Sequence, residues 1–228
     1  MTTPDDTSDD DAALSPERML SLVHRQQQQI TARTAAFVPW MLLAWGVAWL
    51  AGFLVLWADV RQHPDEPLPT LAAGVTFAAL LIAAGVLSTV LGALSGRGLR
   101  GTRRAAFVGI VYGNTWWVGG IVLFVIGQAL AAHGMSDALL VVFYPSVFIF
   151  FSGIMYLMAG VIWDAAPMLV LGIWSVILAA VGASLQHPTA FLVYAIAGGG
   201  AFLVVAAWSA WWRRGARRSL AQTGDDCA

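Results

Sequence analysis

Six long apolar segments make up nearly all of the chain between Phe37 and Trp212, and they restrict the fold more than any other feature of the sequence. The hydrocarbon core of a bilayer is about 30 Å thick, so a helix that crosses it needs roughly 20 apolar residues. Hydrophobic residues form 59% of the chain and charged residues 11%, whereas about 25% charged residues is usual in soluble domains. The sequence therefore predicts six transmembrane spans, at residues 37–57, 70–94, 106–130, 138–162, 167–186 and 190–212.

The spans are expected to be helices, because the apolar runs are continuous and lack the alternating polarity of membrane barrel strands. We therefore expect an all-α polytopic membrane protein whose six transmembrane helices form one bundle, residues 35–212. Residues 1–34 are expected to be a cytoplasmic tail and residues 213–228 a basic cytoplasmic tail. In the first tail, Ser15, Pro16 and Glu17 are typical of a helix start and predict a short amphipathic helix. That helix either docks a cytoplasmic partner or lies against the membrane surface.

The uneven distribution of arginine predicts the orientation of the spans. Six spans place both termini, the second loop and the fourth loop on one side of the membrane. Eleven of the twelve basic residues belong to that side, and only Arg61 belongs to the other. Because basic residues in short loops favour the cytoplasm, we expect a bacterial plasma membrane protein with both termini cytoplasmic. The arginines nearest the ends of the spans on that side are Arg97, Arg100, Arg103, Arg104, Arg213, Arg214, Arg217 and Arg218.

The third span contains the most polar and aromatic patch within any predicted span. An amide in hydrocarbon needs hydrogen-bonding partners, so we expect Asn114 to face the interior of the bundle, with Gly109 and Gly113 admitting a neighbouring helix. If the first and third spans adjoin, their aromatic and polar residues line a cavity suited to an apolar or cationic solute. In the alternative interpretation, Asn114 joins helices and the tryptophans fill space or face lipid. The candidate cavity residues are Trp45, Trp49, Tyr112, Asn114, Thr115, Trp116 and Trp117.

Asp164 is the only acidic residue between the fourth and fifth spans. A carboxylate at this boundary has two interpretations: it carries a coupling proton, or it caps the fifth span, with Pro167 in the first turn. No Asp, Glu, Arg or His lies near the middle of any span. This pattern argues against a transporter driven by protons or sodium, which needs buried ionisable groups.

The sequence offers little support for an enzyme, a cofactor site or a nucleic-acid partner. It contains no recognised protease or hydrolase motif, and the single cysteine, Cys227, excludes an intrachain disulfide. The GxGxxG match at residues 96–101 joins two membrane spans instead of a strand and a helix, so we attribute it to topology. His63, His133 and His187 lie in three external loops and form a weak candidate for a metal site, so we assign no metal.

The stretch from Gly153 to Gly200 carries packing glycines and boundary aromatic residues. It resembles a group of small six-helix bacterial membrane proteins of unassigned function, some of which are loosely labelled transporters. The resemblance implies the fold and the membrane location, and it assigns no catalytic or binding residue. The positions that carry it are Tyr156, Ala159, Gly160, Trp163, Asp164, Pro167, Leu171, Gly172, Trp174, Gly198, Gly199 and Gly200.

Two functions follow from this sequence. The first is a transport-related membrane component, either a small permease or the membrane subunit of a larger transporter. The second is a regulatory or scaffolding protein that binds another membrane protein. The expected partners are the lipid bilayer and a membrane or cytoplasmic protein, and the sequence leaves a homo-oligomer open.

Overall fold

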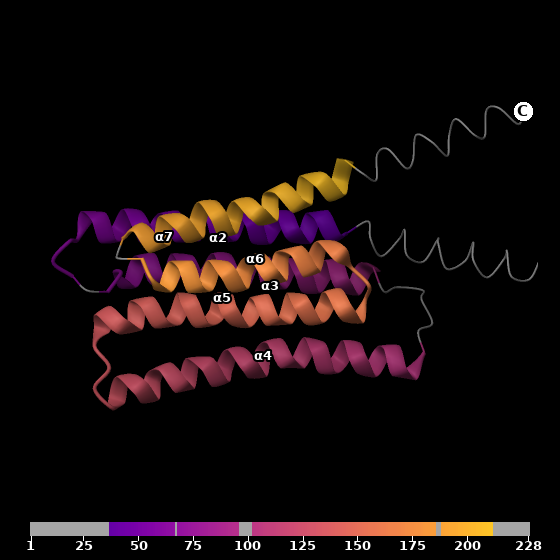
Figure 1. Ribbon diagram of the computed structural model, residues 1–228, viewed down its shortest axis with the longest axis horizontal. Coiled ribbons are helices and arrows are strands. Elements are labelled where there is room, and N and C mark those ends of the chain that lie inside the picture. The colour runs from indigo at the N-terminus through magenta and orange to yellow at the C-terminus, as the bar shows by residue number, and fades with distance from the viewer. Residues whose placement is uncertain (1–36, 67, 96–101, 186–187, 212–228) are drawn as a thin grey trace, which may run out of the picture.

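The computed structural model describes residues 37–66, 68–95, 102–185 and 188–211, and all of its regular structure is helical (Figure 1). Six helices are long and apolar enough to cross a membrane, and they run side by side in one bundle. The all-α, six-helix prediction is therefore confirmed, and the fold suits a multi-pass membrane protein. The helices are α2 (Val38–Gln62), α3 (Leu71–Ser95), α4 (Arg103–Ala132), α5 (Asp137–Ile162), α6 (Ala166–Ala183) and a last span, Thr189–Trp211.

The last span is not a uniform α-helix. It begins with α7 (Thr189–Val193), continues through the π-helical segment η1 (Tyr194–Gly199), and then returns to α-helix as far as Trp211. Short π-helical segments are rare, because they widen the helix and shift its hydrogen-bonding pattern by one residue. The predicted span at residues 190–212 therefore exists but contains an irregularity that its apolar sequence does not reveal.

Polar residues near the membrane boundary decide where several helices begin and end. The hydroxyl of Thr102 accepts a hydrogen bond from the Ala105 amide at 3.2 Å, and α4 accordingly begins three residues before the predicted span. Helix α2 continues past the predicted boundary at residue 57, and Asp59 in its last turns contacts the start of α3. The two carboxylate oxygens of Asp59 accept hydrogen bonds from the amide and the hydroxyl of Thr70, each at 2.7 Å.

Four of the six spans form the centre of the bundle, and two lie at its periphery. Helices α5 and α6 pack along their length, and α2 packs against the last span. By contrast, among the described residues α3 has an extensive contact only with α2, and α4 only with α5; α4 lies along one edge of the bundle (Figure 1). Only 6% of the residues in the most apolar windows of α3 and α4 are buried, against 39% in α2 and 50% in the last span.

Aromatic rings and glycines fill the centre of the bundle. The Trp49 ring lies 5.3 Å from the Phe202 ring, and the Phe53 ring lies 5.3 Å from that of Tyr194. Glycine permits this packing, because a Cβ on Gly198 would lie 2.9 Å from the Trp49 ring. Close approach at small residues is the usual way in which membrane helices gain van der Waals contact. The core is therefore built on α2 and the last span.

Several sequence-based expectations concern residues outside the described part of the chain. They include the amphipathic helix of the first tail, the GxGxxG match, His187, Cys227 and the arginines at positions 97, 100, 213, 214, 217 and 218. Arg103 and Arg104 are described, and they form the exposed first turn of α4.

Candidate functional site

Trp45 and Trp49, the two candidates on α2, have partners within the bundle. The Trp45 indole N–H donates a hydrogen bond to the Ser88 hydroxyl of α3 at 2.9 Å. The Trp49 side chain is 6% exposed and contacts Phe53 and Phe202 edge to face. Both indoles therefore pack against neighbouring helices.

Tyr112 and Trp116 lie on the side of α4 that faces α5. The Tyr112 hydroxyl donates to the Met155 carbonyl at 3.1 Å, and its ring lies 4.8 Å from that of Trp163. The Trp116 ring lies 5.7 Å from the rings of both Phe151 and Tyr156. From the sequence we did not place the rings of Phe151 and Tyr156 of α5, or that of its C-cap residue Trp163, in this cluster. Their spacing in and just after α5 was a signal in the sequence, but it could be interpreted only once α4 was known to pack on α5.

The structure does not bring the two groups of candidates together. Helices α2 and α4 share no extended interface, because α5, α6 and the last span connect them in the bundle. The aromatic rings of Tyr112 and Trp116 are occupied by rings of α5, and those of Trp49 by rings of the core. The geometry therefore supports a packing role for Trp45, Trp49, Tyr112 and Trp116.

Asn114, Thr115 and Trp117 behave differently from Tyr112 and Trp116. The Asn114 amide donates to the Ile110 carbonyl of its own helix at 2.8 Å, and the Thr115 hydroxyl donates to the Val111 carbonyl at 2.8 Å. Asn114 is exposed, and the Trp117 side chain is 72% exposed. The expectation that Asn114 faces the bundle interior is therefore wrong. A shift of two residues from Tyr112 rotates a side chain by about 200° around a helix, away from α5.

The glycines of α4 fall into two classes. A Cβ on Gly119 would overlap the Phe151 ring, and a Cβ on Gly127 would overlap the Tyr144 ring, so both glycines admit rings of α5. No atom lies within 4 Å of a Cβ built on Gly109 or Gly113. The expected small-residue face at Gly109 and Gly113 therefore exists, but no helix in the described part of the chain packs against it.

Polar contacts anchor α4 to α5 near the other end of their interface. The Gln128 amide donates to the Tyr144 hydroxyl at 2.9 Å, and that hydroxyl donates to the Phe124 carbonyl at 3.3 Å. The hydroxyl of Tyr112 on α4 and that of Tyr144 on α5 thus link the two helices near opposite ends of their interface. None of the other described helices covers the side of α4 that faces away from α5.

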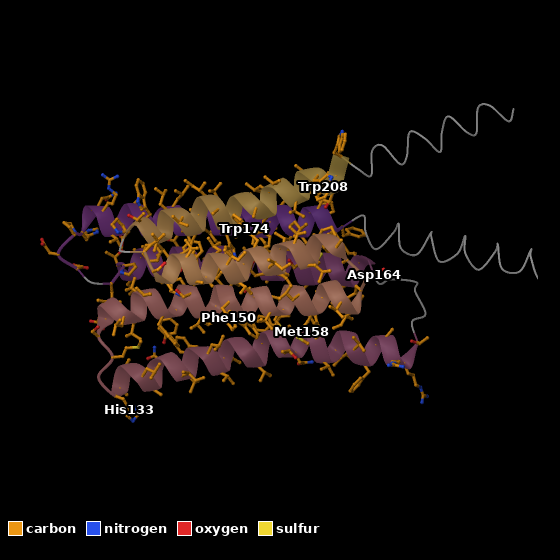
Figure 2. The ribbon with its side chains drawn as sticks, viewed as in Figure 1. His133, Phe150, Met158, Asp164, Trp174 and Trp208 are labelled. Carbon is orange, nitrogen blue, oxygen red and sulfur yellow. The ribbon has the colours of Figure 1, made fainter. Side chains whose placement is uncertain are left out.

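Asp164 lies at one end of the bundle, opposite the end that holds His133 (Figure 2). It does not cap α6, whose N-cap residue is Ala165 without a side-chain hydrogen bond. Instead Asp164 has a left-handed backbone, φ 49°, and the next amide, that of Ala165, donates to the Gly160 carbonyl at 2.9 Å. This is the arrangement that ends many α-helices. Asp164 therefore closes α5, and the helix-cap interpretation placed it on the wrong helix.

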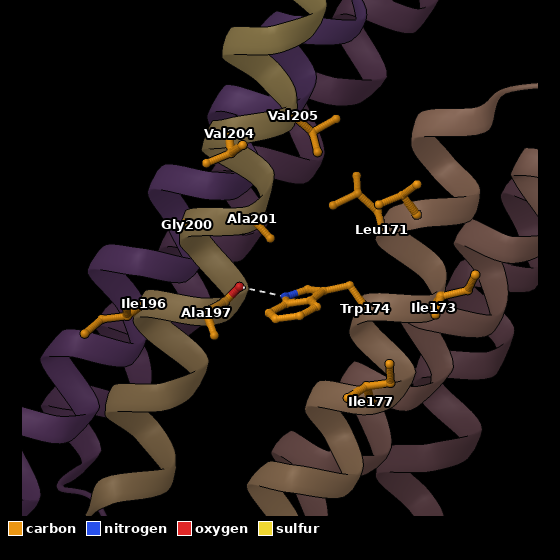
Figure 3. A pocket seen from close by; sticks show the side chains of 11 residues that line it. Leu171, Ile173, Trp174, Ile177, Ile196, Ala197, Gly200, Ala201, Val204 and Val205 are labelled. Atoms are coloured by element: carbon orange, nitrogen blue, oxygen red, sulfur yellow. Dashed lines mark hydrogen bonds between the residues drawn. The ribbon is translucent and has the colours of Figure 1, made fainter.

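A groove of about 590 Å³ lies between α6 and the last span (Figure 3). Its walls are aliphatic, except for the Trp174 indole, which projects across it. The indole N–H donates to the Ala197 carbonyl in η1 at 2.9 Å. Since this N–H is already engaged, the side chains lining the groove offer apolar surface and suit a lipid chain better than a polar solute.

Other polar side chains in the helices bond carbonyl groups of their own helix, and the acidic and histidine side chains of the described residues do not gather in one place. The Ser146 and Ser152 hydroxyls donate to carbonyls four residues earlier, as is usual in membrane helices. The ring nitrogen Nδ1 of His133 lies 2.7 Å from the Ala129 carbonyl, at the end of α4. Within the described ranges, no three His, Cys, Asp or Glu side chains gather in a metal-binding group.

Comparisons with known proteins give this chain no relative. No protein-family model matches it, and no curated protein or solved structure is significantly similar to it. The functional argument therefore depends on the geometry described above.

Proposed function

We propose that this protein is a membrane-embedded component of a larger assembly and that it binds another integral membrane protein through α3 or α4. One observation carries the proposal: these two helices each pack against a single neighbour, and 6% of the residues in their most apolar windows are buried. Lipid can cover such helices. Their glycines, however, suggest contact with another protein.

Unoccupied glycines in the membrane helices are concentrated on α3 and α4. Gly74 and Gly85 of α3, like Gly109 and Gly113 of α4, have no atom within 4 Å of a Cβ position. On the central helices, Gly46, Gly52, Gly153 and Gly172 each receive a neighbouring side chain or backbone. A glycine inside a helix costs roughly 0.5–1 kcal/mol relative to alanine. Glycines that receive a partner helix offset this cost through close packing.

The geometry favours an assembly component over a self-contained permease. A permease needs groups that replace the hydration of its solute along a path through the bundle. The groove beside Trp174 presents aliphatic side chains, and the aromatic candidates of α2 and α4 pack against other rings. A transport role for this protein therefore belongs to the assembly, with the partner supplying the path. We also propose the bacterial plasma membrane as its location, with both termini cytoplasmic, from the distribution of arginine.

The test compares two matched glycine substitutions. Gly85→Leu places a bulky side chain on the open side of α3, and Gly200→Leu does the same on the last span, where a Cβ also has no atom within 4 Å. Tagged wild type and both variants are purified in mild detergent, and co-purifying membrane proteins are quantified by mass spectrometry. We expect a partner in near-equal amount with wild type and Gly200→Leu, reduced at least about tenfold with Gly85→Leu.

Equal recovery of the partner with all three proteins would place the contact away from α3. Purification of wild type from its native membrane without any stoichiometric membrane protein would contradict the proposed function. Thermal unfolding of both variants provides the folding control.

A further inference from the structure

The outward side of α4 carries a continuous strip of residues at helical spacing. Its members follow the pattern i, i+3, i+4, i+7 and i+11, so they share one side of the helix. Ile110, Trp117 and Ile121 of this strip are 63%, 72% and 62% exposed. We call it the α4 strip: Ile110, Gly113, Asn114, Trp117 and Ile121.

Asn114 makes this strip an unfavourable surface for lipid alone. A side-chain amide has two N–H donors and a carbonyl acceptor, and Asn114 uses one N–H, toward Ile110. None of the described residues donates a hydrogen bond to its carbonyl oxygen. Asn114 lies eleven residues after Arg103, which puts it about 16 Å along the helix and near the middle of a bilayer core. Water is scarce at that depth, so the free groups require a protein partner.

Gly113 and Trp117 make the strip complementary to a copy of itself. Trp117 is the largest side chain on the strip, and Gly113, one turn earlier, has open space beside it. When two such helices run parallel, a large residue of one reaches the turn before its own position on the other. Trp117 of each helix can therefore lie over Gly113 of its partner. A close approach of this kind also brings the two Asn114 amides within reach.

Membrane topology then selects a second copy as the occupant. All copies of this chain cross the bilayer in the same direction, so two α4 helices related by a two-fold axis along the membrane normal run parallel. Identical residues meet at identical depth in that arrangement. An amide is both donor and acceptor, so one Asn114 satisfies another reciprocally. A different protein would need a matching polar group at the same depth.

We propose that the α4 strip is a homodimer interface, in which paired Asn114 amides exchange hydrogen bonds and Trp117 packs over Gly113 of the second copy. This inference rests on the proposed function, because it assigns an occupant to one of the two peripheral helices and leaves α3 for the other membrane protein. The α4–α5 interface remains intact in the dimer, because Tyr112 and Trp116 use the other side of α4.

The experiment measures mass and cross-linking of the full chain. Asn114→Leu removes the amide, and Thr115→Val is the matched control, because Thr115 also bonds its own helix but lies outside the strip. By light scattering in mild detergent of the full chain produced in a host that lacks its membrane partner, we expect wild type and Thr115→Val at twice the chain mass of 24.3 kDa. Asn114→Leu should raise the apparent dissociation constant of the dimer at least about tenfold.

Cross-linking in native membranes tests the strip itself. In a Cys227→Ser background, Ile110→Cys should form an oxidative cross-link between two copies. Val111→Cys, at the same depth, 47% exposed and pointing about 100° away, should not. A monomeric wild type, an undiminished dimer in Asn114→Leu, or equal cross-linking at both positions would overturn the dimer. A monomer that still carries a stoichiometric membrane protein would overturn the dimer and leave the proposed function standing.

Discussion

At the scale of single residues, Asp164 ends helix α5 through its backbone conformation. Its φ of 49° lies in the left-handed region, and the bond from the Ala165 amide to Gly160 closes α5 there. Left-handed backbone costs an L-residue roughly 1–2 kcal/mol, less for Asp and Asn than for β-branched residues, and almost nothing for glycine. The short connection to α6 depends on this one turn.

The effect of a substitution at position 164 on the free energy of unfolding should therefore depend on how easily the new residue adopts a left-handed backbone, and not on its charge. Asp164→Gly should keep or raise the free energy of unfolding by up to about 1 kcal/mol, because glycine adopts this φ freely. Asp164→Val should lower it by about 1–2 kcal/mol. Unfolding of the purified protein by SDS in mixed micelles gives both values. A valine variant as stable as wild type would contradict this role.

At the scale of helices, α6 and the last span meet at a glycine, Gly182, where any added side chain would overlap a ring of the last span. A Cβ on Gly182 would overlap the ring of Tyr194, which is 1% exposed and begins η1. The ring is enclosed by Phe53 and by the Ser146 hydroxyl, 3.0 Å from its own hydroxyl, so it has little room to move. The contact between the two helices is therefore fixed by the size of residue 182.

Gly182→Ala should accordingly lower the free energy of unfolding by about 1–3 kcal/mol, the usual cost of overpacking. The matched control is Gly200→Ala, because a Cβ there meets nothing within 4 Å. Better helix propensity should leave that variant unchanged or up to about 1 kcal/mol more stable. SDS unfolding of the two alanine variants side by side measures the difference. Equal free energies of unfolding for Gly182→Ala and Gly200→Ala would contradict the prediction, because the Tyr194 ring would then move aside without cost.

The π-helical segment η1 accepts a hydrogen bond from a side chain of α6. Its Ala197 carbonyl accepts the hydrogen bond from the Trp174 indole at 2.9 Å (Figure 3). Trp174→Phe keeps an aromatic ring in the groove but removes the donor, and should lower the free energy of unfolding by about 1 kcal/mol. Trp211→Phe is the control, since Trp211 is 73% exposed at the end of the last span. The comparison uses the same SDS titration, and equal losses in the two variants would argue against a role for the indole N–H.

At the scale of the whole molecule, the orientation that we propose from the distribution of arginine can be tested by labelling. In a Cys227→Ser background, cysteines at Gln62, which ends α2, and at Ala132, which ends α4, should react with an impermeant maleimide added to intact cells. A cysteine at Leu99, in the predicted second loop, should react only after lysis. Labelling of Leu99→Cys from outside, with protection of the other two, would reverse the proposed topology.

The number, type and approximate limits of the helices could be predicted from the sequence. A bilayer imposes both the length and the apolar composition of every span, so each span is recognisable without knowing its neighbours. The differences at the ends have local causes. Helix α4 starts early because Thr102 caps it, and α2 runs on past residue 57 because Asp59 engages Thr70. Such contacts need a second residue whose position the apolar pattern does not give.

The faces of the helices could not be predicted in the same way. In a membrane both the buried and the lipid-facing sides of a helix are apolar, so periodicity does not distinguish them. Tyr112 and Asn114 are two residues apart and looked like one patch, yet one packs on α5 and the other faces outward. Sequence alone therefore determined that this chain forms six helices that are long and apolar enough to span a membrane. Only the tertiary structure decided which helices touch, because helix pairing depends on the fit between particular rings and glycines, and it left α3 and α4 with sides that no part of the described bundle covers.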